Sequence, residues 1–374
     1  MQYTEYELGE LLPFEQPTAY IVKSTDYSDA YATPVLTAGK SFILGKTNET
    51  DGIFDQLPVI IFDDFTTATQ FVNFRFKVKS SAMKILQINT DLVIPKYIFY
   101  RLQIIQFDHS THKRYWIQSY SKIKVLIPPL DEQSRIVTRI DELFSELDKA
   151  VDTLKTTKEQ LEVYRQAVLV DAFRVATNST HLKIGYVCAK IVDCPHSTPK
   201  WEKNGKLCLR TTNFKRGYLD LQSPNYVSEE TFNDRNRRII PQPGDVLYSR
   251  EGSVLGIACT IPSNVYPCLG QRMMLLRSGE KLNNRYLMHY LNSPMVTNHV
   301  IATKGGTGSP HINVGDIKEF QIPIPSLEEQ SNIVRQIEEQ LSSCDNVEKT
   351  VDAILTQADA MRQSILKQAF EGTL

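Results

Sequence analysis

The residues that could carry out catalysis do not complete a motif in this sequence. The run Gly39–Ser41 has the glycine, lysine and serine that end a phosphate-binding loop, but Pro34 replaces the earlier glycine of such a loop. Asp245 and Glu251 lie where a metal-dependent nuclease would carry carboxylates, but Ser253 stands in place of the expected lysine. The dinucleotide-binding, zinc-protease, serine-hydrolase and amino-methyltransferase patterns are also absent. We therefore expect no active site in this chain.

The cysteines predict neither disulfides nor a metal site. All six lie in the second half of the chain and none forms a C-x-x-C pair, which is typical of a protein of the reducing cytoplasm. Cys194 and His196 are the nearest approach to a metal motif, and two ligands are too few. No apolar run approaches the roughly 18 residues of a membrane helix. We expect a cytoplasmic protein without a bound metal.

Loops rich in polar and basic residues indicate contact with nucleic acid. The segment Lys304–His311 combines a lysine, three glycines with accessible backbone donors, and a histidine. Arginine side chains suit the guanine edge and glutamine side chains suit adenine, although most basic residues only position phosphates. The predicted DNA-binding residues are Thr37, Lys40, Lys46, Lys113 and Arg114 in the first half, with Asp63, Asp64 and Thr66 as further candidates, and Thr212, Lys215, Arg216, Arg250, Gln271, Arg272, Lys304 and His311 in the second half.

Charge is distributed unevenly along the chain, although the total is only −1. Residues 179–325 contain 18 basic and 11 acidic residues, a net charge of +7, whereas residues 1–128 have 13 of each. Residues 129–178 and 326–374 carry net charges of −3 and −5. A polyanion would therefore bind the segments 1–128 and 179–325 and be repelled by the two acidic segments.

An internal repeat organises the chain. The segments 127–137 and 324–334 read IPPLDEQSRIV and IPSLEEQSNIV, at a constant offset of 197 residues. Between 128–174 and 325–371, 18 of 47 aligned positions are identical without a gap. Such a repeat indicates duplication of one structural unit.

Each repeat copy predicts a long helix. Ser326 and Glu329 form a capping box at the start of the second copy, and Pro129 occupies the corresponding place in the first. Apolar residues then alternate at spacings of four and three, which is typical of a coiled coil. In the first copy the predicted seam runs through Ile136, Ile140, Leu143, Leu147, Ala150, Leu154, Thr157, Leu161, Tyr164 and Val168. In the second copy it runs through Ile333, Ile337, Gln340, Cys344, Val347, Val351, Ile354, Ala358, Met361 and Ile365. The alternative is a long amphipathic helix lying on a globular core.

The remaining segments predict two mixed domains. Short apolar runs such as Leu57–Phe62 and Met273–Leu276 are separated by Gly, Pro, Asn and Asp, which favours strands joined by turns. The two segments begin and end alike but differ in the middle. We predict an α+β fold with pseudo-twofold internal symmetry, divided into globular domain 1–128, helix 129–178, globular domain 179–325 and helix 326–374.

The duplicated IP-x-L-x-EQ motif that opens a long helix after a variable globule resembles the specificity subunits of type I restriction–modification enzymes. The strings TPVLTAGKSFILGKTNETDGIF, IIFDDFT, IVDCPHSTPKW, REGS and GTGSPHINV are similar to target recognition domains of that family. The resemblance covers essentially the whole chain. On this resemblance the scaffold residues are Pro128, Leu130, Glu132, Gln133 and Ile140, with Pro325, Leu327, Glu329, Gln330 and Ile337 in the second copy.

The resemblance implies a non-catalytic DNA-recognition subunit. Each globule would be a target recognition domain that reads one half of a bipartite, asymmetric site on double-stranded DNA. The two helices would pair antiparallel, set the gap between the half-sites and bind two methyltransferase subunits. S-adenosylmethionine, ATP and magnesium would be held by those subunits and by motor-nuclease restriction subunits, so that this chain needs no cofactor.

Three other interpretations remain open from the residues. The chain could be a nuclease or methyltransferase with a degenerate motif, or a coiled-coil adaptor whose globules bind proteins. It could also be the specificity subunit of a related system in which one partner chain carries both nuclease and methyltransferase. Base choice depends on side-chain geometry and DNA shape, so the sequence does not reveal the target.

Overall fold

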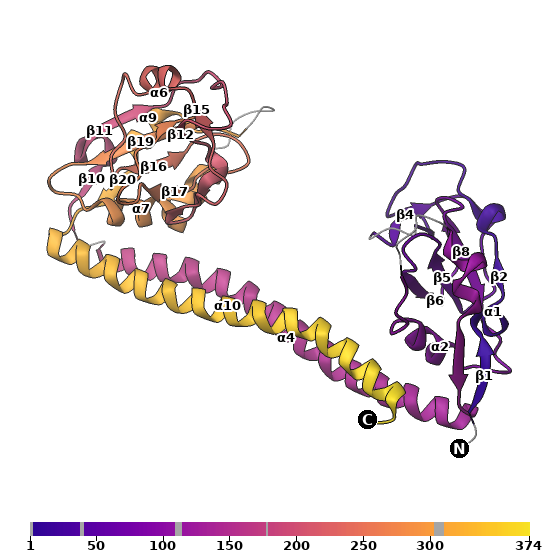
Figure 1. Cartoon of the computed structure of the whole chain (residues 1–374). Coiled ribbons are helices and arrows are strands. Elements are labelled where there is room, and N and C mark those ends of the chain that lie inside the picture. Colours follow the sequence, from indigo (N-terminus) through magenta and orange to yellow (C-terminus); the bar gives the residue numbers. More distant parts are fainter. Residues whose placement is uncertain (1–2, 38–40, 109–113, 177–178, 303–309) are drawn as a thin grey trace. The chain divides into compact units, whose positions relative to one another are not determined.

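The computed structural model describes residues 3–37, 41–108, 114–176, 179–302 and 310–374. Contacts divide the chain into two compact units. The first unit comprises Met1–Leu154 and Ala353–Leu374, and the second comprises Lys155–Asp352. Each unit therefore combines one globular segment with a part of each of the two long helices, α4 (Leu130–Val175) and α10 (Leu327–Glu371) (Figure 1).

The starts of the long helices follow from local sequence. Glu329 accepts a hydrogen bond from the backbone N–H of Ser326 (2.9 Å), and the Ser326 hydroxyl accepts one from the N–H of Glu329 (3.2 Å). This confirms the predicted capping box, which satisfies backbone donors that have no partner inside the helix. Acidic residues occupy the first turn of both helices, where they complement the helix dipole.

The two long helices run antiparallel within each unit. In the second unit, Lys158 contacts Asp352 (2.8 Å) and Arg165 contacts Asp345 (2.7 Å), so residue numbers rise on one helix as they fall on the other. In the first unit, Arg362 forms an ion pair with Asp148. Arg362 and Asp148 are the repeat equivalents of Arg165 and Asp345, so one Arg–Asp pair occurs in both units. These pairs fix the direction and the register of the helices.

One column of the predicted helix seam is in the right place, and in the other Ile136 is buried and Leu143, Thr157 and Ile333 are partly buried. Leu147, Val168, Cys344, Val351 and Ala358 are buried as expected. For most of each helix, the second row of inward-facing residues lies one position later in the sequence than the predicted row. Ala150, Tyr164, Val347, Ile354 and Met361 are exposed, and Phe144, Val151, Lys158, Arg165, Leu341, Glu348, Leu355 and Arg362 take the partly buried places. The charged members of this column can lie there because their stems cover apolar surface while their charged groups pair across the helices.

The first globule has two sheets with separate cores. The four-stranded sheet has the order β2-β8-β5-β6, and the three-stranded sheet has the order β4-β3-β7. Along β5, Ile60 and Phe62 pack toward the helices, and Val59 and Ile61 pack toward the other sheet. This period-two alternation makes β5 a strand buried on both faces. The strands are β2 (Phe14–Glu15), β3 (Thr33–Leu36), β4 (Ile43–Thr47), β5 (Val59–Asp63), β6 (Thr69–Val72), β7 (Lys77–Val78) and β8 (Met83–Gln87).

The second globule repeats this topology. Its sheets have the orders β11-β19-β16-β17 and β15-β12-β18, and in both units the three-stranded sheet contains one parallel and one antiparallel pair. Along β16, Val246 and Tyr248 pack toward the helices, and Leu247 packs toward the other sheet. The strands are β11 (Cys188–Asp193), β12 (Lys206–Leu209), β15 (Tyr226–Val227), β16 (Val246–Ser249), β17 (Ala258–Thr260), β18 (Cys268–Leu269) and β19 (Met273–Ser278).

The predicted α+β class is therefore confirmed, and the two middles share the order of their two main sheets while differing in sequence and in added elements. The second globule adds a hairpin of β13 (Phe214–Lys215) and β14 (Tyr218–Leu219), and helix α6 (Glu229–Arg235). The fold depends on which positions are apolar, so unrelated sequences can keep the same sheets while their loops differ.

A two-stranded antiparallel ribbon closes each globule. It joins β1 (Thr4–Glu7) to β9 (Lys124–Ile127) in the first unit and β10 (His181–Lys183) to β20 (Gln321–Pro323) in the second. The ribbon leads directly into the following long helix. The shorter helices are α1 (Leu8–Leu11), α2 (Pro95–Leu102) and α3 (Tyr115–Gln118) in the first unit and α5 (Ile184–Val187), α7 (Asn284–Asn292), α8 (Pro294–Ala302) and α9 (Val314–Glu319) in the second; 3₁₀ turns cover Pro17–Tyr20, Tyr120–Lys122 and Thr211–Asn213.

Candidate nucleic-acid interface and its scaffold

A buried glutamine joins each globule to the long helix that follows it. Gln133 is fully buried and accepts a hydrogen bond from the N–H of Ile94 (2.7 Å), and its amide nitrogen donates to the carbonyls of Leu92 (3.1 Å) and Pro128 (2.9 Å). Ile94 is the residue that precedes α2. One side chain therefore satisfies three backbone groups on two elements.

The second unit repeats this glutamine clamp, the buried side chain with its three backbone bonds. Gln330 is fully buried, accepts from the N–H of Asn283 (2.8 Å) and donates to the carbonyls of Lys281 (2.9 Å) and Pro325 (3.0 Å). Asn283 precedes α7, as Ile94 precedes α2. The glutamine of the duplicated motif therefore fixes how the globule meets its helix in both copies.

A second repeated contact lies about two turns further along each long helix. Asp141 accepts from the hydroxyl of Tyr100 (2.6 Å) and contacts Lys96 (2.6 Å). Glu338 takes the place of Asp141 in the second unit, where it contacts His289 (3.4 Å) and Arg285. Burial lowers the pKa of His289, and the hydrogen bond to His289 lowers the pKa of Glu338, so a neutral imidazole lies against a carboxylate.

The opposite end of the other long helix completes each attachment. Phe370 of α10 packs edge-on against Tyr97 of α2, with ring centroids 5.3 Å apart. Phe173 of α4 packs in the same way against Tyr286 of α7, at 5.1 Å. Ile140 and Ile337 are buried in the same two clusters. Each globule is thus held by the start of one long helix and the end of the other.

The remaining motif residues lie on the helix starts. Glu132 forms a hydrogen-bonded ion pair with Arg135, which lowers the pKa of Glu132. Pro128 and Pro325 provide carbonyls to the glutamine clamp. Leu130 and Leu327 are 44% and 49% exposed at equivalent positions, so these two leucines do not contribute to the core.

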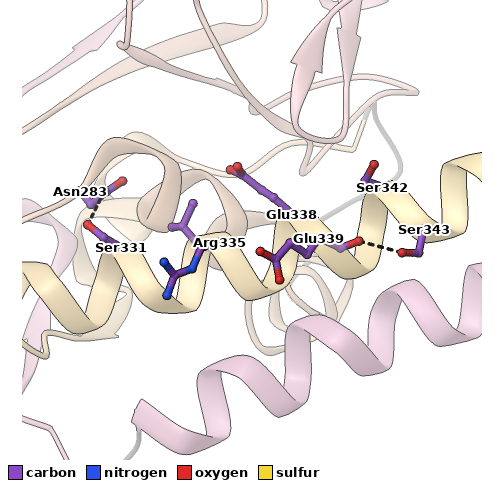
Figure 2. A pocket seen from close by; sticks show the side chains of 8 residues that line it. Asn283, Ser331, Arg335, Glu338, Glu339, Ser342 and Ser343 are labelled. Atoms are coloured by element: carbon purple, nitrogen blue, oxygen red, sulfur yellow. Dashed lines mark hydrogen bonds between the residues drawn. The ribbon is translucent and has the colours of Figure 1, made fainter.

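An open groove of about 690 Å³ lies along the start of α10 in the second unit. Figure 2 shows Ser331, Arg335, Glu338, Glu339, Ser342 and Ser343 of α10, with Asn283 at one end. The first copy carries Ser134, Asp141, Glu142 and Ser145 at the places of Ser331, Glu338, Glu339 and Ser342. The groove-lining residues are therefore largely shared by the two repeat copies.

Arg250 is part of the fold and does not face solvent. Its side chain is 9% exposed, and its guanidinium pairs with both carboxylate oxygens of Asp193 (2.8 and 3.1 Å) and contacts His196 (3.3 Å). This burial disfavours the predicted contact between Arg250 and DNA. Arg250 follows β16 and Asp193 ends β11, so the pair joins the edge of the four-stranded sheet to its centre.

In the first globule an acidic residue, Asp64, takes the position of Arg250 after the central strand, but its partner Lys84 lies on the neighbouring strand β8 and not on the edge strand. Asp64 follows β5, is 2% exposed, accepts from the N–H of Trp116 (2.9 Å) and contacts Lys84 (3.4 Å). Asp63 accepts from the N–H groups of Phe65 and Thr66 in the next turn. Both carboxylates hold the fold, which disfavours their predicted role as base contacts.

Arg235 is a structural residue that the sequence did not single out. It is 7% exposed and donates to the carbonyls of Leu269 (2.6 Å), Gly270 (2.9 Å), Ser197 (3.1 Å) and Pro195 (3.3 Å). An arginine at the end of a short helix resembles any surface cation in the sequence. Only the packing shows that it joins two loops.

Gln271 and Arg272 lie in the connection between β18 and β19. Arg235 and Arg250 both form hydrogen bonds to this connection. Gln271 donates to the carbonyl of His196 (2.6 Å), and Arg272 lies 3.5 Å from the carboxylate of Glu251 with half of its side chain exposed. Glu251 also forms a β-bridge with His311, which is exposed. The structure thus brings Gln271, Arg272 and His311 together around one loop cluster.

Lys215 and Arg216 belong to a different surface. They line a cleft of about 300 Å³ with Glu162, Asp345 and Glu348 of the long helices, and Arg216 donates to the carbonyl of Asn292 (3.2 Å). Arg165 also lines the cleft and is paired with Asp345 and Glu348, so three carboxylates balance three cations and make this a poor site for phosphate. Thr212 is exposed in the adjoining 3₁₀ turn. The predicted residues of the second half therefore form two groups.

The described DNA-binding candidates of the first half, Thr37, Lys46 and Arg114, lie on three separate segments. Thr37 follows β3, and its N–H donates to the carbonyl of Phe42 (2.9 Å). Lys46 is half-buried in β4, and Arg114 is exposed just before α3. Lys40, Lys113 and Lys304 lie outside the described residues.

Within the described residues, no group of three or more His, Cys, Asp or Glu side chains could hold a metal ion. Cys194 instead accepts a hydrogen bond from the N–H of Met273 (3.4 Å). None of the described helices is long and apolar enough to span a membrane.

Comparison with known proteins assigns the family. The family model for the type I restriction modification DNA specificity domain matches residues 2–163 and 190–357. The chain is 33% identical to the EcoR124I/EcoR124II specificity subunit of Escherichia coli, over 87% of this chain and 84% of that protein. It is 26% identical to the EcoKI specificity subunit of E. coli K12, over 68% of this chain and 59% of that longer protein.

Solved structures share the fold. One solved structure comes from a study of complex assembly and conformational transition of the type I R-M system. It matches with a TM-score of 0.70 and 19% identity, over 100% of this chain and 98% of that chain. The HsdS subunit from Thermoanaerobacter tengcongensis matches with a TM-score of 0.54, covering 100% and 97% at 19% identity. The chain belongs to the type I restriction modification DNA specificity domain family.

The glutamine clamp can be tested by truncation. Gln330→Ala leaves one buried N–H and two carbonyls without a partner, each worth about 1–3 kcal/mol. We expect the free energy of unfolding to fall by roughly 3–6 kcal/mol on this basis, and Gln133→Ala to act similarly on the first unit. Urea unfolding followed by circular dichroism measures the change. Gln340→Ala, at an exposed site of the same helix, is the matched control; an equal effect there would contradict the clamp.

The neutral His289 predicts a pH dependence of stability. Its pKa lies below the ordinary 6.5, so the unfolded chain takes up this proton first as the pH falls, and stability declines with acidification. The lowered pKa of Glu338 adds a loss in the same direction at lower pH. His289→Tyr imitates Tyr100 of the first unit and should reduce the fall in melting temperature between about pH 7 and pH 5.5, around the histidine pKa. An unchanged pH profile would show that His289 is not the group concerned.

Proposed function

We propose that this chain is the DNA-specificity subunit of a type I restriction–modification enzyme and that each globule reads one half of a bipartite, asymmetric site on double-stranded DNA. One observation carries the proposal. Both units have the same sheet topology and the same glutamine clamp, but the side chains at corresponding loop positions differ in kind. A duplicated frame with unlike loops fits recognition of two different sequences.

The loop residues support a division between reading bases and positioning phosphates. The second globule carries a net charge of +7 and presents Arg272 and Gln271 beside one another. Their functional groups suit purine edges in the major groove. The first globule has no net charge, so we assign much of the phosphate contact at its half-site to a partner subunit.

The two long helices would set the gap between the half-sites. A helix of 46 residues measures about 69 Å at 1.5 Å per residue. The antiparallel ion pairs and the acidic character of the helices make them a scaffold that DNA would avoid. The number of helical residues would then determine the number of base pairs between the half-sites.

We assign two copies of one methyltransferase subunit as partners of the scaffold. Leu130 and Leu327 are exposed at equivalent positions, and the lining of the groove at Ser331 and Glu339 has counterparts in the first copy. Two similar surfaces on one chain suit two copies of the same partner. The methyltransferase would hold S-adenosylmethionine, and motor-nuclease subunits would hold ATP and magnesium; the assembly would act on cytoplasmic DNA.

Methylated-base mapping tests this proposal. The chain is expressed with its neighbouring methyltransferase in a host that lacks other adenine methylation, and the same methyltransferase is expressed alone. We expect a methylated bipartite motif with a fixed gap only when this chain is present. If both proteins associate and no motif appears, the proposal is wrong and an adaptor role is favoured. If this chain alone methylates or cleaves DNA, it is an enzyme in its own right.

The spacer role predicts the effect of lengthening the helices. Four residues inserted near Lys155, between Asp148 and Lys158, add about 6 Å to α4. A matched insertion in α10 between Asp352 and Arg362 keeps both ion pairs in register. With a rise of about 3.4 Å per base pair, the gap in the methylated motif should grow by one or two base pairs while both half-sites stay the same. A changed half-site would contradict the spacer role.

A further inference from the structure

We propose that Arg272 selects a base pair in the second half-site and that Arg235 and Arg250 are positioning residues that hold its loop. The inference rests on the proposed function, because it assigns residues within that half-site. Arg272 belongs to the connection of Gly270, Gln271 and Arg272 between β18 and β19. This three-residue segment, with Arg272 at its end, is named here the arginine loop.

The backbone of Arg272 lies in the left-handed region. Its φ is +65°, and the other non-glycine residues with positive φ in the described chain are Thr67 and Asn264. Asparagine is tolerated in this region, but a long side chain such as arginine is uncommon there. Such a conformation persists where surrounding contacts enforce it, and it is concentrated at functional sites.

Each residue of the arginine loop is held by a separate hydrogen bond. The N–H of Gly270 donates to the carbonyl of Leu209 (2.9 Å), and the carbonyl of Arg272 accepts from the N–H of Arg250 (3.0 Å). The Gln271 side chain donates to the carbonyl of His196 (2.6 Å). A β-carbon at Gly270 would meet the Leu209 oxygen at 2.2 Å, so the loop lies directly against β12. The enforced conformation therefore has identifiable causes.

Arg235 holds the arginine loop from below the surface. Its guanidinium donates to the carbonyls of Leu269 and Gly270 on one side and of Pro195 and Ser197 on the other. Four carbonyls on two segments require the planar, multiple-donor geometry of arginine, which a lysine ammonium does not reproduce. Arg235 thereby fixes the loop of His196 relative to the arginine loop.

Arg250, which follows β16, also holds the arginine loop. Besides the ion pair with Asp193, its N–H donates to Arg272 and its carbonyl accepts from the N–H of Ile312 (2.9 Å). Three loops of the second globule therefore meet at one buried arginine. The Arg250 side chain is 9% exposed and its guanidinium is engaged by Asp193, so it acts on recognition through the residues it holds.

Arg272 is the arginine of this network whose side chain is exposed. Its side chain is 53% exposed, against 9% for Arg250, and its Nε lies 3.5 Å from the Glu251 carboxylate. The bidentate contact with guanine uses two guanidinium nitrogens held in a defined plane. A carboxylate at Nε limits the rotation of that plane. The geometry thus assigns base reading to Arg272 and support to the two buried arginines.

Arg272→Gly is the sharpest test, because glycine accepts the left-handed backbone and the fold should be kept. The variant is purified with the methyltransferase and tested on duplexes in which each base pair of the second half-site is changed in turn. We expect preference at one base pair to fall by roughly 10- to 100-fold, the range of a bidentate contact, with the first half-site unaffected. Arg272→Gln, a second variant, should shift preference at that pair toward adenine.

Arg237→Ala is the matched control, since Arg237 is 80% exposed in the same globule and is paired with Asp234. It should leave the methylated motif unchanged. If Arg272→Gly and Arg272→Gln keep the wild-type base preferences, the inference is wrong. A uniform loss of affinity for all sequences, with a salt slope reduced by about 1, would make Arg272 a phosphate contact and also overturn it.

Arg235→Lys and Arg250→Lys test the positioning role. Each keeps the charge and loses the planar geometry, so we expect broadened preference at the same base pair that Arg272 controls. Arg235→Met and Arg250→Met should broaden the preference at this base pair more than the lysine variants do. Equal loss at both half-sites, or a fall in stability without any change in base preference, would show a structural role only.

The inference and the proposed function fail in different ways. If the wild-type complex writes no bipartite motif, the proposed function fails before any variant is made. If the wild type writes the motif and the Arg272 variants write it with the same base preferences, the proposed function holds and the inference alone fails.

Discussion

A single buried amide determines how each globule meets its long helix. Gln133 and Gln330 each satisfy one N–H and two carbonyls that would otherwise be buried without partners. Because the duplicated motif supplies the same amide at the same helical position, two globules with unlike sequences are attached in the same way. The other repeated contacts add to this attachment but vary in chemistry, as the replacement of Tyr100 and Asp141 by His289 and Glu338 shows. The amide geometry is therefore the constraint that the variable residues must respect.

The sequence predicted the features that depend on periodicity and local chemistry. The repeat, the two helices and the capping box at Ser326 follow from spacing and from hydrogen-bonding groups close together in the chain. The exact seam did not follow, because Leu143 and Phe144 are both apolar and only the partner helix decides which of them faces inward. Arg165 and Arg362 also looked like surface residues, whereas their stems lie in the seam and their guanidinium groups pair with Asp345 and Asp148.

The candidate site was predicted less well, for a related reason. Arg250 and Arg272 have the same side chain, but one is buried against Asp193 and the other is exposed beside Glu251. Burial depends on contacts with residues far away in the sequence, which composition does not show. Arg235 was missed because its partners are backbone carbonyls, and these have no residue type to recognise. Asp64 was misassigned because its partner Lys84 lies on another strand.

The division of labour among arginines also explains how one frame accommodates different recognition loops. Buried charged groups are costly unless each is paired, so the network of Asp193, Arg235 and Arg250 tolerates little change in its members. Exposed groups such as Arg272 carry no such cost, and they can be replaced without loss of the sheet beneath them. In the first globule Asp64 takes the position of Arg250 with the opposite charge, and its partner Lys84 lies on the neighbouring strand β8. What the two globules share is therefore a paired buried charge under an exposed loop, and the side chains above it are free to differ.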